Sequence, residues 1–261
     1  MEKRPDVRLA FLMGKRVITP AGRLGLADPY LKTSRAKEHL ESLRQELQVF
    51  YESKPCRFFR EDDFENQRHI VKMKVTNTPD RVSLIAGDFL FNLRASLDQL
   101  IWYLAKVTLP YPRDTQFPIL DKPDAGLIRR RTKGLPTQAA AIIESLQPYN
   151  TPNPADIQNH QLWRLNKMCN IDKHMRIPVH GSTGVVTLPI PVVASGHRFD
   201  DDLILNLPVG LKSEMAVDPQ VTFKVVFGDF YWKISCDLDD LQAMYEFIAN
   251  NVIPKFSRFF T

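Results

Sequence analysis

Cysteine is scarce in this chain of 261 residues, and so are long apolar runs; each shortage excludes a class of protein. The three cysteines, Cys56, Cys169 and Cys236, lie far apart, and an odd number cannot all pair within one chain. A disulfide-stapled secreted domain is therefore not expected, and reduced thiols favour a cytoplasmic protein. No apolar run approaches the ~18 residues that a membrane span requires, so we expect no membrane partner.

Glycine is also scarce, with 11 residues, and the sequence has no phosphate-binding loop, dinucleotide fingerprint or esterase nucleophile turn. The stretch GSTG, 181–184, lies between β-rich segments and is interpreted as a hairpin turn. Cys169, His174 and His180 have irregular spacing, and no Cys-x-x-Cys pair or carboxylate accompanies them. We therefore expect neither a metal site nor a cofactor.

Composition and charge are close to those of ordinary globular proteins. Apolar residues make up 44% of the chain and charged residues 25%, so the chain can bury a full core. The formal net charge of +5 is moderate. It leaves room for an anionic partner without arguing for one, because many basic proteins bind no nucleic acid.

Apolar periodicity predicts helices in the first two thirds of the chain. Asp28 and Pro29 open the first long helix, whose apolar face repeats at intervals of three and four residues. The longest helical stretch covers 80–107, and Pro136 and Pro148 bound a shorter helix. The other predicted elements are a strand pair at 56–62 and 69–77, a short basic helix at 124–133, and a helix at 155–173.

The character of the chain changes after residue 175. The segments 185–193, 202–209 and 221–236 are rich in β-branched and aromatic residues, which predicts antiparallel strands. An amphipathic helix, kinked or ended by Pro254, closes the chain. We therefore predict an α+β fold, a bundle of long helices with an antiparallel β-sheet. One interdigitated domain over 1–261 is expected, with a helical part at about 28–175, a β-rich part at about 176–237 and a C-terminal helix at about 238–260.

The longest predicted helix mixes polar and aromatic residues on the side opposite its leucine-rich face. This side carries Asp88, Phe91, Asn92, Ala95, Gln99, Trp102 and Tyr103. Arg94 and Asp98 flank it as an i, i+4 pair, which in the simplest interpretation is a solvated ion pair. Three aromatic residues are unusual on a freely exposed face, because their burial would stabilise the fold by several kcal/mol. A groove, a subunit interface or a structural network is therefore favoured over a simple surface.

Four motifs of this chain occur in the same order in a widespread bacterial family of uncharacterised proteins. They are GDFLFNLRASLDQLIWYLA, QFPI, LPTQAAAIIESLQPY and HQLWRLNKMCNIDKH, within 87–176. Members of that family typically carry Asn-Leu-Arg-Ser-Ala-Leu-Asp-His and Asn-x-x-Asp-Lys-His-Arg. The chain resembles this family over about a third of its length. The resemblance is a family signature and implies no particular chemistry.

The central helix also resembles the Arg-x(4–6)-His motif of the HEPN superfamily, helical bundles that often act as metal-independent RNases. The resemblance implies that Arg94 would stabilise charge developing on a phosphate, with a histidine as general acid and base, usually across a dimer cleft. Gln99 stands where that histidine is expected, and a carboxamide has no proton to exchange near neutral pH. Ala95 replaces the polar residue that often follows the arginine. Both departures favour a degenerate site.

A second polar cluster lies at the end of the predicted helix at 155–173. It consists of Asn170, Asp172, Lys173 and His174. In the simplest interpretation, Lys173 and His174 complement the exposed carbonyl groups of a helix C-terminus. In the functional interpretation, the cluster faces Arg94 and Asp98 across a groove, and His174 supplies the missing acid and base.

Two other candidate sites also have simple structural interpretations. The run Arg129, Arg130 and Arg131 forms either a solvated basic turn or a patch that contacts phosphates, with an affinity that falls steeply with salt. Cys169 lies beside His174 in the sequence but on the apolar side of its helix, where a buried, inert thiol is commoner than a nucleophile.

Two functional hypotheses follow. In the first, the chain is a non-catalytic binding or interaction protein with a degenerate HEPN-like site. Its expected binding residues are Asn92, Gln99, Trp102, Asn170, Asp172, Lys173, Arg129, Arg130 and Arg131. In the second, it is a metal-independent HEPN-like RNase of a defence or toxin system, with Arg94, Asp98 and His174 as catalytic residues. A homodimer and an RNA or protein partner are compatible with both.

Overall fold

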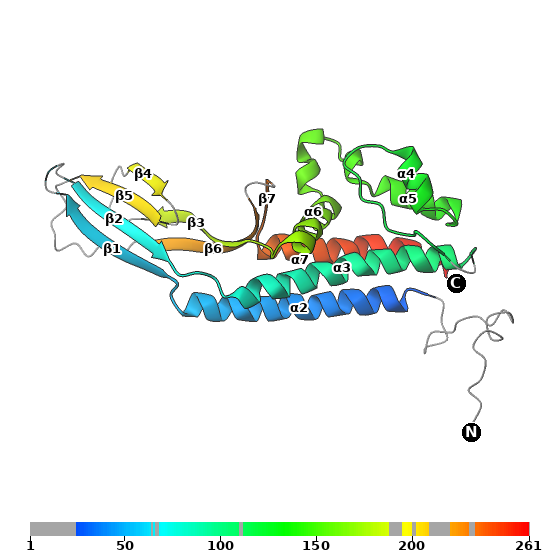
Figure 1. The fold of residues 1–261 in the computed structure, drawn as a ribbon, viewed down its shortest axis with the longest axis horizontal. Helices are drawn as coiled ribbons and strands as arrows, with labels where there is room; N and C mark the ends of the chain where they lie inside the picture. Colours follow the sequence, from blue (N-terminus) through cyan, green and yellow to red (C-terminus); the bar gives the residue numbers. More distant parts are fainter. Residues whose placement is uncertain are drawn as a thin grey trace, which may run out of the picture.

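The computed structural model describes residues 25–63, 65, 68–109, 112–187, 195–199, 202–208, 220–229 and 233–260. Long helices lie together at one end of the molecule, and a β-sheet extends away from them at the other end (Figure 1). The fold is α+β, as predicted: a helical bundle that carries antiparallel strands. Within the described residues, no helix is both long enough and apolar enough to cross a membrane.

Two long antiparallel helices form the base of the bundle (Figure 1). Helix α2 (Ala27–Glu52) and helix α3 (Asp80–Lys106) begin and end close to the predicted positions. They pack together through leucines at intervals of three and four, each of which stabilises the fold by about 2 kcal/mol when buried. These leucines are Leu40, Leu43 and Leu47 in α2, and Leu90, Leu93, Leu97 and Leu100 in α3. A hydrogen bond from the Tyr103 hydroxyl to Asp28 ties the two helices together at one end.

Helix α6 (Gln161–His174) crosses α3 at a position without a side chain, Gly87. A Cβ atom at Gly87 would lie 2.6 Å from Oδ1 of Asp172. The Asp172 carboxylate therefore occupies the space that any other residue at position 87 would fill. This contact brings the second polar cluster of the sequence against the central helix.

Two predicted helices change type along their length. The first consists of η2 (Pro154–Asn159) followed by α6. The second, at the end of the chain, consists of α7 (Leu238–Glu246), η3 (Phe247–Val252) and η4 (Ile253–Phe259). The first change occurs at His160, which has an extended backbone and caps α6 by accepting a hydrogen bond from the Leu162 N–H. The second leads through a π-helical stretch to a 3-10 helix that begins around Pro254. Proline has no N–H to continue an α-helical ladder, so the predicted change at Pro254 is confirmed.

The strands form two antiparallel sheets. The four-stranded sheet contains, in order, β1 (Cys56–Asp63), β2 (Arg68–Val75), β5 (Asp202–Pro208) and β4 (Ser195–Phe199). The three-stranded sheet contains, in order, β3 (Val179–Thr187), β6 (Gln220–Asp229) and β7 (Ile234–Cys236). The predicted pairing of the first two strands is confirmed, with Cys56 opposite Val75. Because β2 also pairs with β5, strands that precede α3 and strands that follow α6 share one sheet. The remainder of the predicted strand at 185–193 lies outside the described residues.

The prediction of a hairpin turn at 181–184 is wrong. These residues lie inside β3, where Gly181 is opposite Val225 of β6. The pairing shifts between Thr183 and Val185, so one residue is extra on this strand, as in a β-bulge. Glycine and serine mark turns in many sequences, but here they mark an irregularity within a strand.

After α3 the chain returns across the bundle and is held against α3 by an ion pair. The guanidinium Nη2 of Arg94 donates to the carbonyl oxygen of Phe117 at 2.6 Å, and Oδ1 of Asp98 accepts from the Phe117 N–H at 2.9 Å. The ring of Phe117 is fully buried. We call 117–120 the clasped segment, because its backbone is held by side chains from two directions.

The second hold on the clasped segment comes from Gln147, which is only 1% exposed. Its Nε2 donates to the Pro118 carbonyl at 2.9 Å, and its Oε1 accepts from the Leu120 N–H at 3.0 Å. Gln147 follows α5 (Thr137–Ser145), and α4 (Ala125–Arg131) precedes α5. Both short helices were predicted from the sequence. Gln147 thereby fixes the clasped segment, which precedes both helices in the chain.

Candidate functional site

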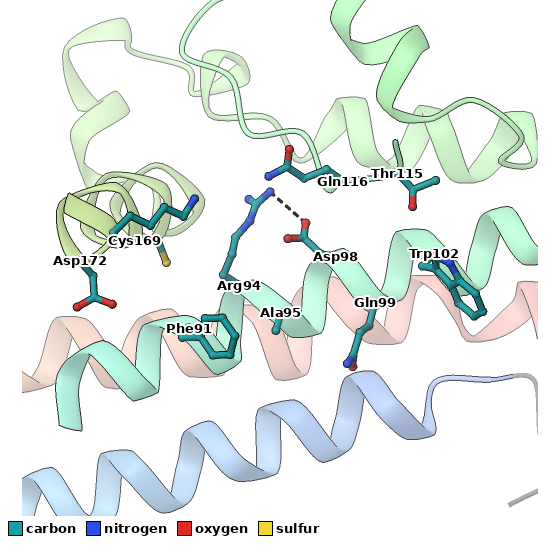
Figure 2. A pocket seen from close by; sticks show the side chains of 11 residues that line it. Phe91, Arg94, Ala95, Asp98, Gln99, Trp102, Thr115, Gln116, Cys169 and Asp172 are labelled. Carbon is teal, nitrogen blue, oxygen red and sulfur yellow. Dashed lines mark hydrogen bonds and ion pairs between the residues drawn. The ribbon is translucent and has the colours of Figure 1, made fainter. Parts of the chain in front are cut away.

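Helix α3, helix α6 and the residues just before the clasped segment enclose a pocket of about 430 Å³ (Figure 2). Its lining consists of Phe91, Arg94, Ala95, Asp98, Gln99 and Trp102 from α3, Thr115 and Gln116 from the loop, and Cys169, Asp172 and Lys173 from α6. Both polar clusters of the sequence thus contribute to one pocket. Its volume is in the range of small-molecule sites.

Arg94 is the most buried charged residue of this pocket, at 8% exposure. Its Nη2 is engaged by Asp98 at 3.1 Å and by the Phe117 carbonyl. Its Nη1 is buried and has no hydrogen-bond partner within the described part of the chain. A guanidinium offers five N–H donors, and leaving a buried donor unpaired costs about 1–3 kcal/mol. Arg94 therefore has hydrogen-bonding capacity that the protein itself does not use.

Asp98 forms the predicted i, i+4 pair with Arg94, but the pair is not a solvated surface pair. The side chain of Arg94 is 10% exposed and that of Asp98 is 34% exposed. Oδ1 of Asp98 accepts from both Arg94 and the Phe117 N–H. The pair is therefore part of a structural network that positions the clasped segment, in addition to lining the pocket.

Gln99 points away from Arg94, toward helix α2, although both residues line the pocket (Figure 2). Positions five apart on an α-helix are separated by about 140° around its axis, which accounts for the divergence. The Oε1 atom of Gln99 is buried and has no hydrogen-bond partner among the described residues. Position 99 therefore does not present its side chain to the Arg94 guanidinium within this chain.

Two aromatic side chains give the pocket apolar surface. Phe91 is 62% exposed and Trp102 is 37% exposed, which is high for residues of this size. The ammonium groups of Lys32 and Lys106 lie 5.7 Å from the ring centres of Phe91 and Trp102, respectively. Such cation–π contacts attract a positive charge to a ring face and leave the other face available.

Helix α6 contributes Cys169, Asp172 and Lys173 to the pocket, but Asn170 and His174 do not line it. Both of the latter are exposed. Residues three and four apart share one face of a helix, so the side chains at 169, 172 and 173 lie together. The positions that follow 169 and 173 directly are turned away from that face. His174 is accordingly not part of the lining that Arg94 and Asp98 share.

Asn92 belongs to the packing between α2 and α3 and does not line the pocket. It is 7% exposed, and its amide nitrogen donates to the Asp88 carbonyl at 2.8 Å. Its Oδ1 accepts from the Lys32 ammonium at 3.3 Å. The polar groups of Asn92 are therefore used by the protein itself, unlike Nη1 of Arg94.

The basic run of α4 also lies outside the pocket lining. Arg129 and Arg130 are exposed, and Arg131 makes a long hydrogen bond of 3.5 Å to the Asp114 carbonyl. Three arginines at the end of a short helix complement the negative end of its dipole. This arrangement agrees with the simpler interpretation, a solvated basic surface.

Two groups in the pocket have shifted pKa values. Burial raises the pKa of the Cys169 thiol to about 12, and its Sγ contacts the Leu90 carbonyl oxygen at 3.6 Å. This is the inert thiol that the sequence predicted. Burial, together with the nearby Asp88 carboxylate, raises the pKa of Asp172. The negative form of Asp172 is thus disfavoured relative to a carboxylate in water.

Sequence reasoning missed the loop residues Thr115 and Gln116, and it did not assign Phe91 to the site. Gln116 begins the QFPI motif, so the motif marked the region without revealing its role. A sequence pattern shows which face of a helix is apolar, but it does not show which loop crosses that face. The lining from 115 to 116 depends on hydrogen bonds made by residues far away in the chain, Arg94 and Gln147.

Within the described residues, no group of three or more histidine, cysteine, aspartate or glutamate side chains could hold a metal ion. Comparisons with known protein families, curated proteins and solved structures give no match. Function is therefore inferred from the pocket itself. It offers hydrogen-bond donors, a lysine ammonium and aromatic surface, which are groups that bind and orient a ligand.

Proposed function

We propose that this chain is a non-catalytic binding protein whose ligand occupies the pocket between α3, α6 and Gln116. The observation that carries the proposal is the unpartnered, buried Nη1 of Arg94 in a pocket of about 430 Å³. Ligand sites combine largely apolar walls with a few converging polar groups, and this pocket has both. Phe91 and Trp102 provide the walls, and Arg94 and Lys173 provide the polar groups.

The chemistry of the lining favours binding over catalysis. No described histidine lines the pocket, and the carboxamide of Gln99 cannot exchange a proton near neutral pH. The raised pKa of Cys169, about 12, keeps its thiol protonated and weakly nucleophilic. Arg94 and Asp98 are already engaged in holding the clasped segment. A degenerate HEPN-like site that has kept a binding role is consistent with these features.

One observation favours the alternative, a metal-independent HEPN-like RNase of a defence or toxin system. Arg94, Asp98 and Lys173 line the same pocket as Asp172, a carboxylate with a raised pKa. A carboxyl group of this kind can act as a general acid and base, and Arg94 could stabilise charge on a phosphate. In that case Asp172, and not His174, would be the residue on which cleavage depends.

A filled-pocket variant tests the binding proposal. Ala95→Trp places a large side chain in the pocket, whereas Leu84→Trp adds the same side chain on the same helix at an exposed position outside the lining. A library of small polar metabolites is screened by the shift in melting temperature. At least one compound should stabilise the wild type and Leu84→Trp but not Ala95→Trp. Equal stabilisation of all three proteins would show that the pocket is not the site.

An RNA assay separates the two functions. The wild type, incubated with labelled RNA in EDTA, should leave the RNA intact, and so should a folded Gln99→His variant. Cleavage by the wild type that is lost in Asp172→Asn would replace the binding proposal with the RNase. Cleavage gained by Gln99→His alone would show that position 99 still belongs to a decayed HEPN site.

Location and assembly are part of the same proposal. All three cysteines are free, which is consistent with the expected cytoplasmic location. The homodimer and an RNA or protein partner are compatible with a binding role. Sedimentation of the preparations used for the RNA assay, with and without RNA, measures both kinds of association.

A further inference from the structure

We infer that the pocket recognises an anionic head group, a carboxylate or a phosphate, between Nη1 of Arg94 and the ammonium group of Lys173, with a flat apolar body against Phe91. This inference rests on the proposed function, because it names the ligand class of the same pocket. It joins three features of the described residues: a guanidinium nitrogen without a hydrogen-bond partner, an ammonium group without an ion pair and an exposed aromatic ring.

The guanidinium of Arg94 is held in place before any ligand arrives. Its Nη2 donates to the Phe117 carbonyl at 2.6 Å and to Asp98 at 3.1 Å, so the plane of the group is fixed. Nη1 remains without a partner among the described residues, in a residue that is only 8% exposed. A positioned guanidinium forms short, charge-assisted hydrogen bonds with carboxylate and phosphate oxygens, and little entropy is lost on binding.

Two cationic side chains, Arg94 and Lys173, and two carboxylates, Asp98 and Asp172, line the pocket. Lys173 is exposed, lines the pocket and forms no ion pair with any described residue. Asp98 is engaged by Arg94 and by the Phe117 N–H. The carboxylate of Asp172 lies against Gly87, seven residues before Arg94, which corresponds to about 10 Å along the helix. An anion at Nη1 therefore gains the charge of Lys173, and the carboxylate nearest to the guanidinium, Asp98, is already engaged by Arg94 and the Phe117 N–H.

A neighbouring side chain, that of Gln116, can give an anion access to Nη1. Gln116 lines the pocket near the Arg94 guanidinium in Figure 2 and makes no hydrogen bond to a described residue. Its side chain can change rotamer without breaking an internal contact, at the cost of side-chain entropy alone. Gln147, by contrast, makes three hydrogen bonds and is fixed. The loop is thus held by the fixed Gln147 and carries at the pocket Gln116, which has no hydrogen bond to a described residue.

Phe91 suggests the shape of the rest of the ligand. It precedes Arg94 by three residues, so the two side chains are neighbours on one face of α3. With 62% of its surface exposed, its ring can stack with a second ring whose acid group reaches Arg94. Benzoate and phenyl phosphate have this shape, and benzamidine has the shape of benzoate with the opposite charge.

These three compounds, together with inorganic phosphate, form the test. Each is titrated into the full chain, and binding is followed by tryptophan fluorescence, with Trp102 in the pocket as the reporter. Benzoate or phenyl phosphate should bind at least about tenfold more tightly than benzamidine, because only the anions can pair with the guanidinium and the ammonium. The tighter of the two aryl anions identifies the head group as carboxylate or phosphate. Inorganic phosphate should bind more weakly than phenyl phosphate.

Two variants and one control locate the anion. Arg94→Lys retains one donor for the Phe117 carbonyl but loses the second guanidinium nitrogen, and it should weaken anion binding by about tenfold or more. Lys173→Gln changes only an exposed side chain, so it should fold normally and weaken binding by about threefold to tenfold. Lys255→Gln removes the same charge at an exposed position outside the pocket and should have no effect.

The inference is overturned if benzamidine binds as tightly as the anions, if neither aryl anion binds, or if anion affinity is unchanged in both Arg94→Lys and Lys173→Gln. The experiments distinguish failure of this inference from failure of the proposed function. If no aryl anion binds, but a metabolite stabilises the wild type and not Ala95→Trp, the pocket is a binding site for another class of compound. If no compound depends on the pocket at all, both are wrong.

Discussion

Two buried polar side chains hold the same clasped segment, and they differ in how completely the protein uses them. Gln147 makes three hydrogen bonds, and both ends of its amide are satisfied. Arg94 holds the same segment through one nitrogen, and its Nη1 has no hydrogen-bond partner in the part of the chain that the structure describes. Both are almost fully buried, at 1% and 8% exposure.

The difference distinguishes a structural role from a binding role. Burial of a polar group is favourable only when its hydrogen bonds are made, so a saturated group such as Gln147 needs no further explanation. A charged group that keeps one nitrogen unpaired next to a pocket is explained most simply by a ligand. The contrast predicts that substitutions of Gln147 act on stability first and on binding only through the position of the clasped segment, whereas substitutions around Arg94 affect stability and binding directly.

The largest effect is expected for Gln147→Leu. This substitution removes all three hydrogen bonds and leaves the Pro118 carbonyl and the Leu120 N–H unpaired in a buried site. The free energy of unfolding should fall by about 3 kcal/mol, measured by urea denaturation. Gln138→Leu, the same substitution at an exposed position of α5, is the control and should change it by less than about 0.5 kcal/mol. Similar losses in both variants would contradict the role assigned to Gln147.

A smaller effect on stability, with a gain in binding, is expected for Asp98→Asn. The variant keeps an oxygen for the Phe117 N–H but loses the charge that pairs with Arg94. We expect a loss of about 1 kcal/mol in the free energy of unfolding. The affinity for phenyl phosphate or benzoate should rise, because less negative charge then competes for the guanidinium. Calorimetric titration measures that affinity, and a fall instead of a rise would mean that Asp98 itself contacts the ligand.

The smallest effect is expected for Asp172→Asn, and it should depend on pH. Burial and then the neighbouring Asp88 raise the pKa of Asp172 above its unfolded value, so its ionised form destabilises the fold. The stabilising influence of the protonated group is present below the unfolded pKa and is lost as pH rises through the folded pKa. Asp172→Asn should therefore be more stable than the wild type at neutral pH, by less than about 1 kcal/mol because the group is partly solvated.

The pH dependence and a double mutant check this assignment. Thermal melts from neutral to acidic pH should show the gap between Asp172→Asn and the wild type closing as Asp172 becomes protonated. Asp88→Asn should also stabilise the protein. The double variant with Asp88→Asn and Asp172→Asn should gain less stability than the sum of the two single variants, because each single substitution already removes the repulsion between these two carboxylates. Strict additivity, or a gap that widens in acid, would assign the shift to another group.

The helices could be predicted from the sequence because the signals that specify them are local. Leucines at intervals of three and four defined α3, and Pro29, Pro136 and Pro254 marked where helices begin or change. The turn predicted at 181–184 was wrong because glycine and serine favour a turn and a bulge alike. Only the pairing of β3 with β6 distinguishes the two, and that pairing joins distant parts of the chain.

Only part of the site could be predicted, because the signals in a sequence are local. The pattern of α3 identified Arg94, Asp98, Gln99 and Trp102, and the end of α6 identified Asp172 and Lys173; all of them line the pocket. Adjacent residues in a cluster leave a helix in different directions, so His174 was grouped with Lys173 although it does not line the pocket. The position of Gln116 and the hydrogen bonds that fix the clasped segment depend on contacts between distant parts of the chain. No local sequence pattern contains this information.

Gly87 has a consequence for selectivity, although it does not line the pocket. The room that it leaves is filled by the Asp172 carboxylate, which lines the pocket on the side of Gly87. A methyl group at position 87 would force that carboxylate into another rotamer, and a rotamer facing the pocket would pair with Lys173. The protein would then carry its own competitor for an incoming acid. Under the proposed function, the absence of a side chain at position 87 keeps Lys173 available to the ligand.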